Sequence, residues 1–316
     1  MIKKYKENIF LVFSLLMFIA SFLYYTTSVK KPEQVQMTAF LTDYSEGIEY
    51  TMLKQGMEQA AIDYNAELTF RTIRNEDTTT ELLRMIDKEV ESQTQAIILQ
   101  PKNKLILGEK LKELNKLISV SLVNSTIDME ESLPVVATDT YSLGQKLAEQ
   151  MLLTSLNNKP ILMLKENFDY TETFHYYQGI ASILDSASVS YEVREVKGKN
   201  QENQIKELLK KQEYAGVIAF TPSMLELVGK VKTDSNKSEL RIFGFQKTNA
   251  ALALIDNGVV EAIGLSNQFT VGYQAVQQIF MEEINQSDEV EIQQMIVDKT
   301  NLFSEENQKL LFPVVQ

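Results

Sequence analysis

The sequence predicts an α/β protein built from two doubly wound, parallel-sheet lobes joined by a hinge. Short apolar runs alternate with amphipathic stretches of helical period along residues 36–300, a pattern typical of parallel strands covered by helices. The chain contains ten such runs, which is more than one ordinary sheet holds. The runs therefore divide into two consecutive sets, one for each lobe.

The predicted strands share a short apolar centre. They are residues 36–42, 67–73, 96–99, 119–123 and 135–137 in the first set, and 161–164, 190–196, 216–220, 241–245 and 262–265 in the second. The predicted helices carry apolar side chains at helical spacing. They are residues 48–64, 79–90, 104–117, 143–153, 176–184, 205–209, 224–231, 250–255 and 271–284. Ligands of such sheets bind beyond the carboxyl ends of the strands, so we expect a site between the lobes.

An uncharged apolar run precedes the two lobes. Residues 9–27 contain no charged side chain, and this length approaches the ~20 residues that a membrane-spanning helix needs. Lys3, Lys4 and Lys6 precede the run, which favours a cytoplasmic N-terminus. We expect residues 1–31 to form a cytoplasmic tip and one transmembrane anchor.

A cleaved signal peptide is the alternative interpretation of this segment. Thr26, Thr27 and Ser28 offer only a weak small-residue cleavage site after several bulky residues. Both interpretations place residues 32–316 outside the cytoplasm. The expected location is the cell membrane, with a single pass and an extracytoplasmic binding domain.

Charge and composition exclude several classes of function. The net charge is −12, and residues 1–31 hold five basic and one acidic group, which leaves about −16 for the remainder. Such an acidic domain repels phosphate backbones, so we expect no nucleic-acid partner. The chain has no cysteine and a single histidine, His175. We therefore expect no metal site and no cofactor. No nucleophile elbow, Walker A loop or dinucleotide fingerprint occurs, so we expect no enzyme activity.

Several short motifs occur in an order that resembles the type I periplasmic binding proteins, the group that includes ribose- and galactose-binding proteins. The motifs are AFLTDYSEGIEYTMLKQGMEQAA (39–61), ESQTQAIILQP (91–101), SVSLVNS (119–125), VVATDTYSLGQKLAEQML (135–152), YYQGI (176–180), YAGVIAFTPSMLELV (214–228), RIFGFQKT (241–248) and SNQFTVGYQAVQ (266–277). The resemblance covers roughly residues 36–300 and implies residues 36–138 plus 267–295 as the N-terminal lobe. Residues 139–266 plus 296–316 would form the C-terminal lobe. Related repressors carry an N-terminal helix-turn-helix where this chain has its apolar run.

The resemblance also implies ligand-binding positions in this sequence. They are Tyr44, Glu46, Tyr50, Asn124, Asp139, Phe174, Tyr176, Thr221, Gln246 and Ser266. Sugar receptors of this family use Asp, Asn and Arg to pair hydroxyl groups and aromatic rings to stack on the sugar. Here Asn124 and Gln246 stand where Asp is usual, and Phe174 stands where an Arg normally clamps the ligand. Losing an Arg removes the fork of donors that pairs with two oxygens.

Each of these positions also has a structural interpretation. Tyr50 and Tyr176 lie on helical patterns, where an aromatic is more often part of the core. Asp139 precedes a predicted helix and is suited to capping it. Asn124, Thr221 and Gln246 follow strands, where turn chemistry competes with ligand binding.

The sequence thus predicts a membrane-anchored extracytoplasmic solute-binding protein. Its ligand would be a small polar molecule such as a carbohydrate, and its partner an ABC permease or a sensor histidine kinase. The alternative is a degenerate binding-protein fold that acts as a protein-interaction or scaffolding module without a small-molecule ligand.

Overall fold

The computed structural model describes residues 14–21, 34–42, 48–74, 78–101, 104–124, 133–154, 156–166, 171–281, 292–305, 307 and 311. The chain divides into two compact units, residues 1–35 and 36–316. In the first unit, residues 14–21 are helical. Most of the predicted anchor, residues 9–27, lies outside the described residues. Within the residues that are described, no helix has the length and apolar character needed to cross a membrane.

The first sheet of the second unit has five strands in the order β2-β1-β3-β4-β5. They are β1 (Val35–Thr42), β2 (Ala66–Ile73), β3 (Ala96–Leu99), β4 (Ser119–Val123) and β5 (Val135–Val136). The pairs β1–β3, β3–β4 and β4–β5 are parallel.

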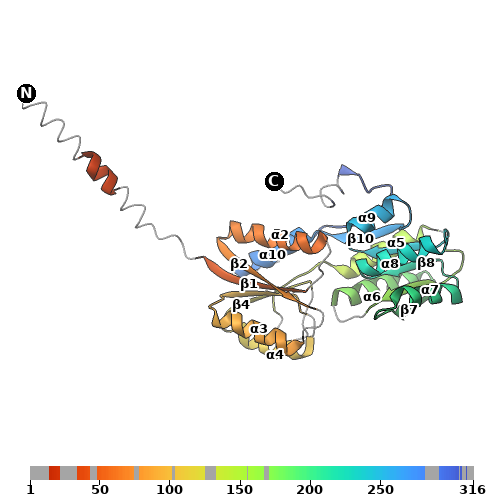
Figure 1. Ribbon diagram of the computed structural model, residues 1–316, viewed down its shortest axis with the longest axis horizontal. Coiled ribbons are helices and arrows are strands. Elements are labelled where there is room, and N and C mark those ends of the chain that lie inside the picture. Colours follow the sequence, from red (N-terminus) through yellow and green to blue (C-terminus); the bar gives the residue numbers. More distant parts are fainter. Residues whose placement is uncertain are drawn as a thin grey trace, which may run out of the picture. The chain divides into compact units, whose positions relative to one another are not determined.

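Helices cover both faces of this sheet (Figure 1). They are α2 (Ile48–Asp63) and α10 (Gln268–Gln277) on one face, and α3 (Thr79–Glu91) and α4 (Lys104–Leu114) on the other. Phe40, Ile97 and Leu99 form a core with residues of α3 and α4. Helix α10 returns to this sheet from a distant part of the sequence and packs against α2 and β4.

The second sheet has six strands in the order β11-β10-β9-β8-β6-β7. They are β6 (Ile161–Lys165), β7 (Tyr191–Glu195), β8 (Gly216–Ala219), β9 (Arg241–Phe245), β10 (Ala262–Ser266) and β11 (Gln294–Asp298). All neighbouring pairs are parallel except β10–β11, which is antiparallel.

The covering helices of the second sheet also lie on both faces. They are α5 (Thr140–Leu152), α6 (Thr171–Ser186), α7 (Gln201–Lys211), α8 (Pro222–Asp234) and α9 (Asn249–Asp256). Alternate residues of β6 enter different cores, because strand side chains alternate between faces. Leu162 and Leu164 pack with residues of α7, α8 and α9, whereas Ile161 and Met163 pack with residues of α5 and α6.

The carboxyl-terminal segment is attached to the second lobe. Leu302 and Leu311 are buried in the core that includes Leu162. The buried Lys247 donates a hydrogen bond from Nζ to the carbonyl oxygen of Leu311 at 2.9 Å. This contact joins the segment to the turn between β9 and α9.

The predicted fold class of two parallel-sheet α/β lobes is confirmed. Three details were wrong. Strand β11 was not predicted, and α5, α6, α7 and α10 each begin three to five residues before the predicted helix starts. The predicted helix at 271–284 ends at Gln277, a 3-10 turn follows at Gln278–Phe280, and residues 282–284 lie outside the described residues. The predicted lobe boundaries stay a prediction.

Candidate functional site

Four polar residues follow neighbouring inner strands of the second sheet. Glu166 follows β6, Thr221 lies just beyond β8, Gln246 follows β9, and Ser266 ends β10. These strands are consecutive in the sheet order. Because neighbouring parallel strands lie about 4.8 Å apart and end at the same edge, the four residues form one row. We call this the second-lobe row.

A matching row lies at the carboxyl edge of the first sheet. Its described members are Thr42 at the end of β1, Gln100 after β3, Asn124 after β4 and Thr138 beyond β5. The Gln100 side chain accepts a hydrogen bond from the backbone N–H of Thr42 at 3.2 Å. We call these residues the first-lobe row, and all four are neutral.

Two hydroxyl groups of the first-lobe row lack a partner. Thr42 and Thr138 are 0% and 6% exposed, and within the described residues their Oγ1 atoms are buried without a hydrogen bond. A buried hydroxyl without a partner is costly, so such groups call for an explanation.

Asn124 is held by a relay of amide groups. Its Nδ2 donates to Gln268 Oε1 at 2.9 Å, and Gln268 Nε2 donates to Ser266 Oγ at 2.8 Å. The relay links the end of β4, the start of α10 and the end of β10. Asn124 and Gln246 both have a left-handed backbone, with φ values of 57° and 64°, which fits residues that turn the chain away from a strand end.

Thr221 and Asp139 are helix caps. The Thr221 hydroxyl accepts a hydrogen bond from Met224 N at 3.3 Å, at the start of α8. Asp139 is exposed, and its carboxylate accepts one from Ser142 N at 3.0 Å, at the start of α5. The structural role expected of Asp139 is therefore present, and any ligand role would be additional.

The three aromatic candidates for ligand binding that the structure describes occupy different environments. Tyr176 is 3% exposed and stacks on Phe245, with ring centroids 3.8 Å apart. Phe174 is 39% exposed on the same helix, beside Tyr177. Tyr50 is half-buried on α2, with the Lys54 ammonium 5.8 Å from its ring centre. The Tyr176 ring therefore belongs to the core. Tyr44 and Glu46 lie outside the described residues.

Sequence reasoning missed Glu166, Gln100 and Gln268. Glu166 is half-buried, and its Oε1 accepts hydrogen bonds from Thr221 Oγ1 at 3.4 Å and Ser223 Oγ at 3.2 Å. Position immediately after a buried strand is the signal that would have found Glu166 and Gln100. The described residues hold no cluster of His, Cys, Asp and Glu suited to a metal ion.

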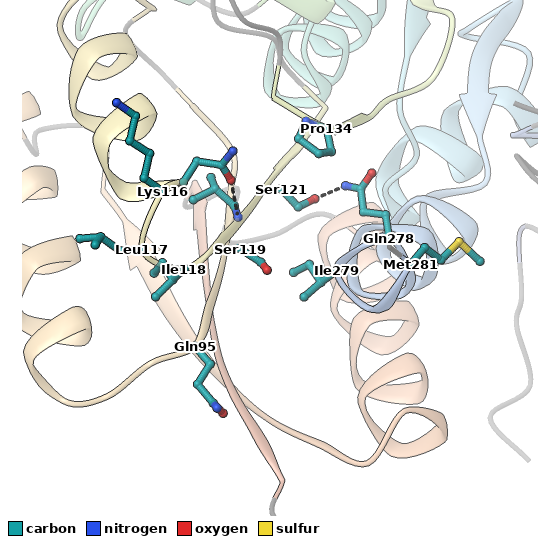
Figure 2. A pocket seen from close by; sticks show the side chains of 12 residues that line it. Gln95, Lys116, Leu117, Ile118, Ser119, Ser121, Pro134, Gln278, Ile279 and Met281 are labelled. Carbon is teal, nitrogen blue, oxygen red and sulfur yellow. Dashed lines mark hydrogen bonds between the residues drawn. The ribbon is translucent and has the colours of Figure 1, made fainter. Parts of the chain in front are cut away.

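A separate hollow lies at the other end of β4 (Figure 2). Its volume is about 410 Å³, and its lining includes Ser119, Ser121, Asn115 and Gln278. Asn115 Oδ1 accepts a hydrogen bond from Val120 N at 3.2 Å, and Gln278 donates to Ser121 Oγ. The hollow is at the amino end of the strand, away from Asn124, so it is distinct from the two rows.

Comparison with protein-family models decides the family. Residues 39–283 match the model described as the periplasmic binding protein domain. The chain belongs to this family. The resemblance to periplasmic binding proteins is thereby confirmed over most of the chain. No curated protein matches the sequence.

Several solved structures share the fold. A carbohydrate transporter solute-binding protein from Agrobacterium radiobacter, in complex with D-arabinose, matches with a TM-score of 0.78 at 15% identity, over 89% of this chain and 99% of that one. GanP, a glucose-galactose binding protein from Geobacillus stearothermophilus, matches with a TM-score of 0.72 at 15% identity, over 86% and 100%. A chain of the XylFII-LytSN complex matches with 0.71 at 18% identity, over 85% and 99%.

Proposed function

We propose that this periplasmic binding protein holds a carbohydrate-type ligand between the first-lobe row and the second-lobe row. The observation that carries the proposal is the pair of polar rows at the carboxyl edges of two doubly wound sheets, the edge at which such folds bind ligands. Both rows carry hydroxyl and amide groups, which can donate to and accept from a polyhydroxylated ligand.

Similar proteins support the ligand class. The Agrobacterium protein was solved with D-arabinose, and GanP is named as a glucose-galactose binding protein. This chain departs from a receptor for ordinary monosaccharides at the clamp, because Phe174 stands where the family resemblance places an Arg. Asn124, Thr221, Gln246 and Ser266 would then hold the ligand with neutral amide and hydroxyl groups.

We also propose that residues 9–27 anchor the protein in the cell membrane and that the binding domain is extracytoplasmic. The uncharged run with three preceding lysines supports this. Mass measurement of the mature N-terminus tests it against cleavage. An intact residue 1 in the membrane fraction supports the anchor, and a new N-terminus near residue 28 contradicts it.

The partner proposed for the bound state is an ABC permease or a sensor histidine kinase. The match to a structure solved as a complex, XylFII-LytSN, supports a protein partner. Purification of the full chain from membranes after crosslinking, with and without ligand, would identify the partner. Recovery of neither class of protein contradicts this part of the proposal.

A thermal-shift screen of the full chain in detergent tests the ligand class. The screen covers pentoses, hexoses, amino sugars, polyols and nucleosides. A ligand at 100 times its Kd stabilises the folded state by about 2.7 kcal/mol, so a binder should raise Tm by several degrees. Absence of any shift across the screen would favour the alternative, a scaffolding module without a small-molecule ligand.

A further inference from the structure

Glu166 is the one charged residue among the described members of the two rows. The other seven described members, from Thr42 to Ser266, are Thr, Ser, Asn and Gln. Two cationic residues, Lys165 and Lys247, are adjacent in sequence to members of the second-lobe row, Glu166 and Gln246. Lys165 is the last residue of β6 and alternates onto the face that carries Ile161 and Met163. The Lys247 ammonium is committed to the carbonyl of Leu311.

One oxygen of the Glu166 carboxylate, Oε2, accepts no hydrogen bond from the described residues. Both of its described partners are hydroxyl groups, Thr221 and Ser223, and both donate to Oε1. Among the described residues neither Lys nor Arg pairs with it, whereas Glu202 and Glu261 have a Lys or Arg partner within 3 Å. A carboxylate accepts through about four lone-pair sites, so Oε2 is available to a further donor.

The location of Glu166 makes its charge effective. Glu166 is half-buried, and its hydrogen bonds from Thr221 and Ser223 place it beside the amino end of α8. An ion pair formed in such a place is screened less than one on an open surface. The acidic domain as a whole adds a field that attracts cations.

We infer that the ligand carries a protonated amine as well as hydroxyl groups, and that Glu166 is the residue that selects it. The chemical class is an amino sugar or an equivalent small aminated polyol. The ammonium would pair with Glu166, while the neutral amides and hydroxyls of the rows would pair the hydroxyl groups. This inference rests on the proposed carbohydrate site and deepens it.

The local hydrogen bonds of Glu166 at the start of α8 are separable from this role in ligand selection. Thr221 already caps α8 through its own hydroxyl, and the Thr221 and Ser223 hydroxyls donate to Glu166 Oε1. A glutamine side chain keeps that acceptor oxygen and loses the charge. Glu166→Gln therefore removes the ion pair with the ligand and retains the local hydrogen bonds.

The experiment compares matched pairs of sugars on the full chain in detergent, below the pKa of the sugar amine. The probes are D-glucose with D-glucosamine, D-galactose with D-galactosamine, and N-acetyl-D-glucosamine as a neutral amide. Affinity is measured by calorimetry for the wild type, Glu166→Gln and Glu239→Gln. Glu239 is an exposed residue preceding β9, so its substitution makes the same change in net charge elsewhere.

We expect an amino sugar to bind at least ten-fold more tightly than its neutral counterpart. Glu166→Gln should abolish that preference, and Glu239→Gln should keep it. Raising the salt concentration should weaken amino-sugar binding to the wild type more than to Glu166→Gln. The Tm values measured without ligand establish whether both variants are folded. If Glu166→Gln does not fold, the salt series on the wild type still tests whether a charged group of the protein contributes to amino-sugar binding.

Equal affinity for neutral and amino sugars, or a preference that survives in Glu166→Gln, would overturn this inference and leave the carbohydrate site standing. Binding of no sugar at all would overturn the proposed function, and this inference with it.

Discussion

Two helix pairs, α2–α10 in the first lobe and α5–α6 in the second, are built on the same device. In the first pair, a Cβ at Gly56 would collide with the carbonyl oxygen of Phe269, and one at Gly272 with that of Leu53. In the second, Gly144 and Gly179 face the carbonyl oxygens of Tyr176 and Tyr141. Reciprocal glycines thus let both pairs of backbones approach closely.

The pairs differ in where their helices come from. Helices α5 and α6 are separated by β6 alone, whereas the whole second sheet except β11 lies between α2 and α10 in the sequence. The first lobe is therefore completed only after most of the second has been traversed. Contacts of such sequence separation form slowly, because the loop must close before they stabilise anything.

Polar side chains join both pairs: among the described residues, Gln145 of α5 donates to Ser182 of α6 at 3.3 Å, and the long-range pair has two such bonds. Tyr273 donates to Asp63 at 2.9 Å, Gln277 donates to Tyr64 at 3.0 Å, and Tyr64 stacks on Phe280. In the second lobe the aromatic support lies inside, where Tyr176 of α6 stacks on Phe245 of β9. The comparison indicates that side-chain hydrogen bonds near the surface hold α2 to α10 in the first lobe, whereas a buried aromatic stack holds α6 to the sheet in the second.

The largest effect is expected from Tyr176→Ala. Removing a fully buried aromatic costs about 3–5 kcal/mol, and here it also withdraws α6 from the sheet. Chemical denaturation should show that loss. Phe174→Ala on the exposed face of α6 is the control and should cost under about 1 kcal/mol. A small effect of Tyr176→Ala would mean that the ring does not anchor the second lobe.

Gly272→Ala and Gly179→Ala should each cost about 3 kcal/mol, because the added methyl meets backbone and cannot be accommodated by a side-chain rotation. Gly229→Ala is the matched control, since its methyl would meet only the flexible side chain of Leu254.

Hydrogen exchange should distinguish the effects of the glycine substitutions on the two helix pairs. Gly272→Ala should lower protection in β1, β3 and β4 first, and Gly179→Ala in β6 and β9. Uniform loss in both variants would contradict independent lobes.

Tyr273→Phe should cost about 0.5–1 kcal/mol through loss of the hydrogen bond to Asp63. The same bond raises the pKa of Tyr273. A raised pKa in the folded state means that the stabilisation is full below about pH 10, the ordinary pKa of a tyrosine, and is lost as pH rises through the folded value. Urea denaturation from about pH 8 to 11 checks this, since the variant should show a flatter profile.

The smallest effect at neutral pH concerns Tyr191 in the second lobe, whose pKa burial raises to about 12. Because the pKa is higher in the folded state than in the unfolded state, the free energy of unfolding should fall as pH rises from 10 toward 12. Tyr191→Phe should reduce that slope and leave stability at neutral pH nearly unchanged. An unchanged slope would show that Tyr191 does not titrate with unfolding.

Local pattern was enough to predict the strands, because most are apolar runs buried on both faces. It failed at β11, where an antiparallel edge strand has only one residue, Val297, fully buried. It also placed the start of α6 too late, since Thr171–His175 are polar or exposed and carry no helical period. Helix starts of this kind depend on packing by later residues.

The rows at the strand ends were partly predictable for a topological reason. The family resemblance implied Thr221 and Gln246, and because parallel strands end at one edge, their strand-end positions also place them in one row. Tyr176 could not be assigned, since a helical aromatic looks the same whether it faces a core or a ligand. Glu166 was overlooked because the family resemblance names no residue there, and its selecting role follows from what the neighbouring strands place beside it.

The contact between Lys247 and Leu311 has a practical consequence for altering the chain's end. A chain shortened before residue 311 deprives a buried ammonium of one acceptor and opens part of the core, a cost that would be felt in the turn carrying Gln246. Loss of ligand binding after such a truncation would therefore reflect loss of the contact between Lys247 and Leu311 as much as any change in the binding residues.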